Sequence, residues 1–266
     1  YLNYYSIMNS KSRKLDAFAK LLDIMDLLRN ECPWDKKQTI ESLRHLTIEE
    51  TYELSESILK GDRSGIKEEL GDILLHIVFY AKIASEENAF DIKDVIDQIS
   101  QKLMYRHPHI FGNIKVADES DVVKNWEVLK LKEGKNNLLS GVPHSLPSLI
   151  KAQRIQEKAA GVGFDWNTAE EVWSKVQEEL VELKVEIQNG SQNKIEEEFG
   201  DFLFSMVNYA RFLNINPDSV LEKANQKFSK RLLFIENSTK EKGKSINELS
   251  HSELNNLWLE AKNYDS

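Results

Sequence analysis

Residues 40–60 read IESLRHLTIEETYELSESILK, and residues 66–84 read IKEELGDILLHIVFYAKIA. In both stretches apolar residues return every three or four positions, which is the period of an α-helix that buries one face. The pair Gly61-Asp62 lies between them and marks the end of the first helix. The sequence therefore predicts two consecutive amphipathic helices in this region.

Each of these two predicted helices carries a pair of acidic residues three positions apart. The pairs are Glu50 with Glu53 and Glu69 with Asp72. At 3.6 residues per turn, positions i and i+3 lie about 60° apart, so each pair shares one helix face. If the helices pack antiparallel, four carboxylates converge, and such like charges require a cation or raised pKa values. Hard oxygen ligands at this density favour Mg²⁺, with Mn²⁺ as the alternative.

An acidic face in a glutamate-rich protein is more often simply solvated. Here Leu43, Leu46 and Leu54 share the face of Glu50 and Glu53. Acids within an apolar stripe need partners, because an unpaired buried charge is very costly. We therefore interpret the acidic residues as a metal site.

The acidic pattern occurs twice in the chain. The residues Glu50, Glu53, Glu69 and Asp72 recur, each displaced by 129 positions, as Glu179, Glu182, Glu198 and Asp201. Four acidic positions in unchanged register indicate an internal duplication. Residues 134–147 are rich in Gly, Asn, Ser and Pro and predict a linker. We expect domains at residues 8–133 and 148–266 on either side of it.

The composition favours an all-α protein. The 266 residues include five prolines and eleven glycines, too few for a turn-rich β fold. Further helices are predicted from Leu15 to Arg29 and from Asp94 to Arg106 by the same periodicity.

Charge and hydropathy limit the partners and the location. A net charge of −9 argues against binding nucleic acid or an anionic membrane, although metal ions can join an acidic protein to a nucleotide. No stretch approaches the roughly 20 apolar residues of a membrane span, and the first residues lack the pattern of a signal peptide. A single cysteine, Cys32, fits a reducing compartment. These features predict a cytoplasmic protein.

Basic residues follow the acidic helices in both halves. Lys102 and Arg106 form an i, i+4 pair, and Lys227 and Arg231 form another. Pairing with surface acids is the ordinary explanation, but recurrence downstream of the carboxylates favours phosphate contacts. Trp126 and Trp258 could stack on a base, and a core or interface role fits them equally well.

The combined motifs resemble the MazG family of all-α nucleoside triphosphate pyrophosphohydrolases. The motifs that carry the resemblance are Cys32-Pro33-Trp34-Asp35, Glu49-Glu50-x-x-Glu53, Glu69-Leu70-Gly71-Asp72, Arg106-His107-Pro108-His109, Val162-Gly163-Phe164-Asp165-Trp166, Glu178-Glu179-x-x-Glu182 and Glu198-Phe199-Gly200-Asp201. The resemblance implies Mg²⁺-dependent hydrolysis of a nucleoside triphosphate at the α-phosphorus, giving the monophosphate and pyrophosphate. It also implies tandem helical domains in four-helix-bundle-type assemblies completed by dimerisation, and a role in house-cleaning of the nucleotide pool.

The resemblance assigns roles to single residues. Its metal ligands correspond to Glu50, Glu53, Glu69, Asp72, Glu179, Glu182, Glu198 and Asp201. Its catalytic acids correspond to Glu49, Glu50, Glu53, Glu178, Glu179 and Glu182. Its substrate-binding residues correspond to Lys194, Lys227, Arg231 and Trp258 in the second half, with Lys102 and Arg106 in the first. Gly65 stands where the second half has Lys194, so we expect weaker triphosphate binding in the first half.

Two other classes of protein would show similar acidic helices. A di-iron carboxylate bundle requires two Glu-x-x-His motifs, and the one instance, Glu248 to His251, has no repeat. A non-catalytic helical dimerisation or regulatory protein would carry acids that only solvate it. A homodimer is expected, because Ile48, Tyr52 and Leu59 lie opposite Leu43 and Leu54 on one helix, so that one repeat cannot bury all of its apolar surface. Pairing of the two halves within one chain is the alternative.

Overall fold

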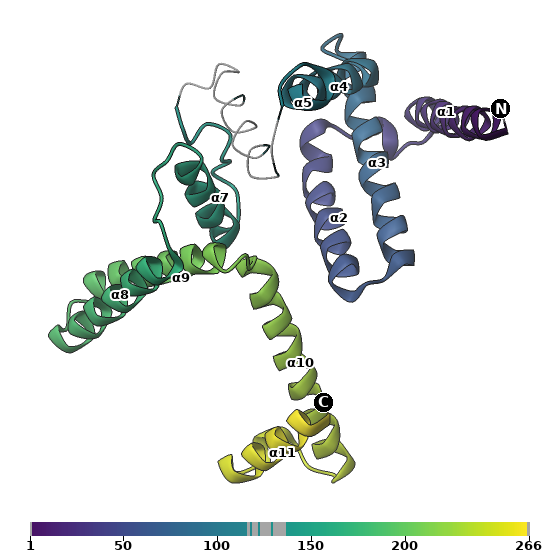
Figure 1. Ribbon diagram of the computed structural model, residues 1–266. Helices are drawn as coiled ribbons and strands as arrows, with labels where there is room; N and C mark the ends of the chain where they lie inside the picture. The colour runs from purple at the N-terminus through teal and green to yellow at the C-terminus, as the bar shows by residue number, and fades with distance from the viewer. Residues whose placement is uncertain (1, 116–117, 119–121, 123–128, 130–136, 265–266) are drawn as a thin grey trace. The chain divides into compact units, whose positions relative to one another are not determined.

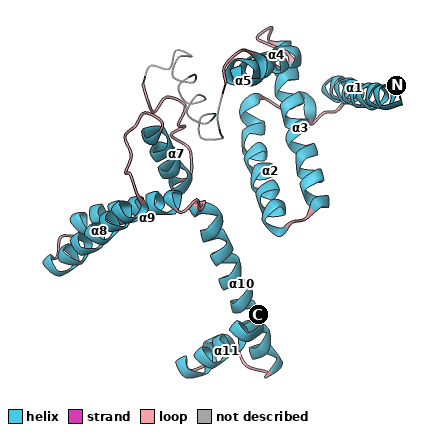
Figure 2. Ribbon diagram, viewed as in Figure 1, coloured by secondary structure: helices cyan, strands magenta, loops and turns pink. Residues whose placement is uncertain are grey.

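A computed structural model describes residues 2–115, 118, 122, 129 and 137–264. Its α-helices are α1 (Leu2–Glu31), α2 (Ile40–Lys60), α3 (Arg63–Glu86), α4 (Ile92–Arg106), α5 (Pro108–Phe111), α7 (Ser148–Ala160), α8 (Ala169–Asn189), α9 (Gln192–Phe212), α10 (Pro217–Glu241) and α11 (His251–Tyr264). Two short 3-10 helices cover Asp35–Lys37 and Ile246–Glu248. Across these described ranges the chain forms helices and loops without a strand (Figure 2). The all-α prediction is confirmed.

The chain divides into two units, Tyr1–Val116 and Ala117–Ser266. Helices α1 to α5 belong to the first unit and helices α7 to α11 to the second (Figure 1). Of the predicted linker, residues 137–147 form turns and loop, whereas residues 134–136 lie outside the described part of the chain. Trp126 also lies outside it. Within the described part of the chain, every helix is too short or too polar to span a lipid bilayer.

The first unit is built around the hairpin of α2 and α3. Thr39 caps α2 by accepting a hydrogen bond from the backbone N–H of Ser42 (3.1 Å). Gly61 ends α2 with a φ of 69°, the left-handed conformation that glycine adopts without strain. Asp62 then caps α3 through the N–H of Ser64 (2.9 Å). These local signals fix the turn between the two helices.

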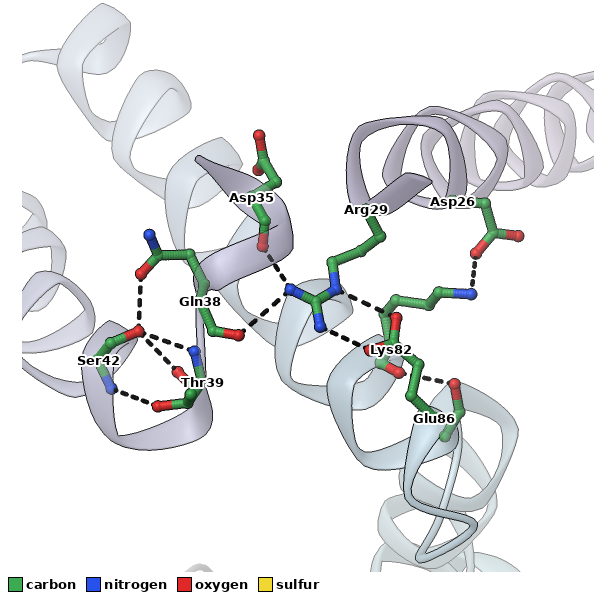
Figure 3. A network of polar contacts seen from close by, with 9 residues as sticks. Asp26, Arg29, Asp35, Gln38, Thr39, Ser42, Lys82 and Glu86 are labelled. Atoms are coloured by element: carbon green, nitrogen blue, oxygen red, sulfur yellow. Dashed lines mark hydrogen bonds and ion pairs between the residues drawn. The ribbon is translucent and has the colours of Figure 1, made fainter. Parts of the chain in front are cut away.

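A small apolar core joins the hairpin to α1. Its buried members are Met25, Leu43, Val78, Phe79 and Ile83. Beside this core, Arg29 donates through Nη2 to Glu86 (2.6 Å) and through Nη1 to the carbonyl oxygens of Gln38 (3.2 Å) and Asp35 (Figure 3). One guanidinium therefore ties α1, the loop before α2 and the end of α3 together.

The second unit repeats the hairpin with α8 and α9. Gly190, with a φ of 84°, ends α8 as Gly61 ends α2. Helix α7 packs on α9, and Nε2 of Gln156 donates to the carbonyl oxygen of Phe204 (2.8 Å). Helix α11 packs on α10, where the rings of Phe228 and Trp258 lie 5.2 Å apart.

Candidate functional site

The hairpin turns explain why acidic residues from two helices meet. Glu50 lies eleven residues before Gly61 and Asp72 lies eleven residues after it. Residues equally distant from the turn of an antiparallel hairpin come to the same level, and i, i+3 neighbours share a face. Carboxylate oxygens of Glu50, Glu69 and Asp72 accordingly lie within 4.8 Å of one another. We call these three residues the first acidic group.

The second unit builds the same arrangement. Glu179 and Asp201 each lie eleven residues from Gly190. Oxygens of Glu179, Glu198 and Asp201 lie within 4.8 Å of one another, and this set is the second acidic group. Glu179 is buried, Glu198 is half-buried and Asp201 is exposed. The structure thus brings together three acids of each predicted set of four.

The fourth acidic residue of each predicted set, Glu53 or Glu182, lies outside these two groups but interacts with them electrostatically. The pKa of Glu69 is raised first by burial and then by the charge of Glu53. The pKa of Glu198 is raised first by burial and then by the charge of Glu182. A cation bound among these carboxylates would relieve their mutual repulsion. A set of hard oxygen donors in this state fits a divalent ion such as Mg²⁺.

A lysine that the sequence analysis missed lies in the second unit. Nζ of Lys175 is 2.6 Å from Oε1 of Glu178 and 2.8 Å from Oε1 of Glu179. These two carboxylates raise the pKa of Lys175. The i, i+3 and i, i+4 spacing to Glu178 and Glu179 was the signal that could have found it. The position 129 residues earlier holds Leu46, so the first unit has no equivalent cation there.

A pocket of about 550 Å³ adjoins the second acidic group. Its walls come from α7, the loop of residues 163–166, α8 and α9, and they include Glu179 and Asp201. Polar side chains in the wall include Gln156, Ser205 and Asn208. The counterpart of Asn208 in the first unit is Phe79, which is buried in the apolar core. The two units therefore carry equivalent acidic residues, but the residues next to these acids differ between the units.

The remaining predicted residues lie elsewhere in the fold or at the edge of the groups. Glu49 and Glu178 are both exposed, and Glu178 pairs with Lys175. Nζ of Lys194 lies 3.9 Å from Glu186, and its side chain is 63% exposed. The other predicted substrate contacts are on α4, α10 and α11, namely Lys102, Arg106, Lys227, Arg231 and Trp258.

One residue of the basic pair on α10, Arg231, contacts an aromatic side chain of α11. The guanidinium of Arg231 lies 5.4 Å from the ring centroid of Trp258, which joins α10 to α11. Arg231 and Trp258 therefore contact each other between α10 and α11. Their binding to the triphosphate stays a prediction.

Comparisons with known proteins match both halves of the chain. The model of the MazG nucleotide pyrophosphohydrolase domain matches residues 38–111 and 167–232. These ranges contain both acidic groups. Gln156 and Trp258 lie outside them.

Several named proteins are similar over most of this chain. The nucleoside triphosphate pyrophosphohydrolase/pyrophosphatase MazG of Thermotoga maritima is 44% identical over 253 residues, covering 93% of this chain and 96% of the relative. The nucleoside triphosphate pyrophosphohydrolase of Escherichia coli K12 is 40% identical over 257 residues, covering 93% and 98%. The protein YabN of Bacillus subtilis is 46% identical over 237 residues, covering 88% of this chain and 48% of that protein. A crystal structure of a mazG-related protein from Thermotoga maritima covers 42% of this chain and 98% of its own, with 28% identity and a TM-score of 0.38.

Proposed function

Since this chain belongs to the MazG family and is a nucleoside triphosphate pyrophosphohydrolase, a hydrolase acting on acid anhydrides, we propose that it uses Mg²⁺ to cleave its substrate between the α- and β-phosphoryl groups. The products are the nucleoside monophosphate and pyrophosphate. This reaction would clear unwanted nucleotides from the pool. The observation that carries the proposal is that Glu179 and Asp201 belong both to the second acidic group and to the wall of the pocket beside it.

The acidic residues would hold the metal. The proposed ligands are Glu179, Glu182, Glu198 and Asp201 in the second unit, with Glu50, Glu53, Glu69 and Asp72 in the first. Mn²⁺ suits the same oxygen donors. When bound, such an ion would supply positive charge near the phosphates and would offset the charge that develops during phosphoryl transfer.

The residues of this chain would position the two reactants. We assign proton acceptance from the attacking water to the carboxylates along α8, Glu178, Glu179 and Glu182, and to Glu49, Glu50 and Glu53 in the first unit. A carboxylate within hydrogen-bond reach of the attacking water can accept its proton. Lys175 adds a cation next to Glu179, at the wall of the pocket. Lys194, Lys227 and Arg231, with Lys102 and Arg106, are the further proposed phosphate contacts, and Trp258 the proposed nucleoside contact.

A homodimer is part of the proposal, because large apolar side chains of the second unit are exposed. Examples are Val181 on α8, Phe199 on α9, and Phe228 and Leu233 on α10, each more than half exposed. In the first unit Tyr52 is 60% exposed on α2. Covering exposed apolar side chains with a second copy removes them from water, which is favourable, and a self-complementary interface between two copies is the commonest oligomeric arrangement. Sedimentation of a monomer at micromolar concentration would contradict the dimer.

The site of attack can be read from isotope labelling. We would incubate the purified chain with a panel of nucleoside triphosphates, Mg²⁺ and ¹⁸O-labelled water, and analyse the products by mass spectrometry. Attack at the α-phosphorus places the label in the nucleoside monophosphate. Label in pyrophosphate, or release of orthophosphate, would contradict the proposed reaction. Activity that survives complete chelation of divalent ions would contradict the role of the metal.

A further inference from the structure

The pocket beside the second acidic group has the features of a small-molecule site. Its volume of about 550 Å³ falls within the range of about 300–1,000 Å³ that ligand pockets have. A nucleotide with its phosphates at Glu179 and Asp201 can reach the pocket, because both residues line it. Phe164 and Trp166 also line it, and they are 82% and 45% exposed. Exposed aromatic faces at a pocket provide surfaces on which a base can stack.

Gln156 offers a hydrogen-bond acceptor in this wall. Its side chain is buried, and Nε2 donates to the carbonyl oxygen of Phe204 (2.8 Å). A carbonyl oxygen can only accept, so this bond fixes the orientation of the amide. Oε1 is then left buried without a hydrogen-bond partner within the described chain. Buried acceptors are nearly always satisfied, and one that is not requires an explanation.

Asn208 offers the opposite group. Its Oδ1 accepts hydrogen bonds from Nε (3.1 Å) and Nη2 (2.8 Å) of Arg211. Arg211 is itself held by Asp165 through a bond of 2.9 Å from Nη1 to Oδ2. Because Oδ1 is occupied, the amide presents Nδ2 as its remaining donor.

We propose that this pocket receives the nucleobase of the triphosphate, with Gln156 accepting a hydrogen bond from the edge of the base and Asn208 donating one to it. The proposal rests on the function proposed above and names the residues that recognise the base. The Watson–Crick edge of each common base carries an N–H donor next to an acceptor, which a fixed acceptor and donor can match, and proteins read unpaired bases through this edge. Arg211 is a positioning residue, because it determines which end of the Asn208 amide is free.

The first unit lacks this arrangement. Phe79 occupies the position of Asn208 and is packed into the apolar core. The inference therefore assigns base recognition to the second unit.

The test uses two substrates that differ in the base alone. ATP and ribose 5-triphosphate would be compared for the wild-type protein, Gln156→Leu and Asn208→Asp. Asn208→Asp keeps an oxygen for Arg211 and replaces the donor with a second oxygen, and the negative charge that it adds acts on the phosphates of both substrates alike. Each variant should lower the ratio of kcat/KM for ATP to kcat/KM for ribose 5-triphosphate roughly three- to tenfold, the effect of losing one hydrogen bond to the base. Asn225→Asp on α10 is the matched control, and its ratio of the two values should equal that of the wild type.

The outcomes separate this proposal from the general function. An equal loss for both substrates in both variants would show that the amides support the fold or the phosphates, and would overturn base recognition. Equal kcat/KM of the wild type for the two substrates would do the same. If the wild type released pyrophosphate from no nucleotide, the proposed function would fail. Calorimetry with AMP and ribose 5-phosphate would then still test the pocket: the proposal requires AMP to bind more tightly and both variants to reduce that advantage.

Discussion

Nζ of Lys175 lies 2.8 Å from Oε1 of Glu179, a carboxylate with only 9% of its side chain exposed. A divalent ion at the second acidic group must therefore share Glu179 with a cation that the chain already provides. The first unit has Leu46 at the position of Lys175, so Glu50 has no such partner from that position.

Replacing Lys175 should strengthen metal binding and weaken substrate binding. Lys175→Met removes a positive charge next to Glu179, and a charge at such a distance is worth about 1–4 kcal/mol near a protein surface. We expect the Kd for Mg²⁺, measured by calorimetry, to fall roughly fivefold or more, and KM for the triphosphate to rise. Lys184→Met, which removes an exposed charge from the same helix, should change neither value by more than about twofold. Weaker Mg²⁺ binding in Lys175→Met alone would contradict this account.

Glu198 should destabilise the metal-free protein near neutral pH. Burial and the charges of Glu182 and Glu179 raise its pKa in the folded state, so the folded state binds the proton more readily than the unfolded state. The contribution of Glu198 to stability is then lost as pH rises through the window between its unfolded and folded pKa values. Without metal at pH 7, Glu198→Gln should have a higher Tm than the wild type, and the difference should shrink as pH falls towards 5.

Mg²⁺ provides the second half of that test. Saturating Mg²⁺ stabilises a protein whose folded state binds it, so it should raise the Tm of the wild type well above that of Glu198→Gln. Glu196→Gln, on an exposed residue of the same helix, should respond to pH and Mg²⁺ as the wild type does. If Mg²⁺ raised the Tm of Glu198→Gln as much as that of the wild type, Glu198 would not be a metal ligand.

Local signals explain why much of the fold could be predicted. Helix α2 begins at Ile40 and ends at Lys60, as expected, because Thr39 and Gly61 are adjacent to its ends. Helix α1 was expected to begin at Leu15 but begins at Leu2, since apolar periodicity does not report a helical segment before the amphipathic stretch. The acidic groups were predictable because their spacing, and their equal distance from a turn glycine, depend on helix geometry alone.

The pocket could not be predicted in this way. Its polar wall combines Gln156 of α7 with Asn208 of α9, and the meeting of these side chains depends on how two separate helices pack. The repeat itself held one signal, since Asn208 stands where the corresponding helix of the first unit has Phe79. The polar side chain lines the pocket, whereas the apolar one is buried in the core of the first unit.

Arg29 should be important for the stability of the first unit. Its side chain is 10% exposed and holds Glu86 and two backbone carbonyls. Arg29→Lys keeps the charge, but a single ammonium cannot reproduce the fork of the guanidinium. We expect the free energy of unfolding in urea to fall by about 1.5–3 kcal/mol, as for hydrogen bonds to charged groups. Lys82→Met breaks the more exposed ion pair with Asp26 (2.7 Å) and should cost under about 1 kcal/mol. Equal losses in the two variants would refute a special role for Arg29.

The second unit should carry most of the catalytic activity. Both units possess an acidic group, but the second adds Lys175 and Lys194 where the first has Leu46 and Gly65. A Cβ at residue 65 would lie 2.6 Å from Oγ and 3.2 Å from Cβ of Ser57, so this serine would have to shift to admit a lysine there. Glu182→Gln should therefore reduce kcat/KM for pyrophosphate release at least 10- to 100-fold, since loss of even a supporting group at a metal site has that effect. Glu53→Gln, the matched change in the first unit, should retain most of the activity. Loss of activity in Glu53→Gln with full activity in Glu182→Gln would reverse the assignment.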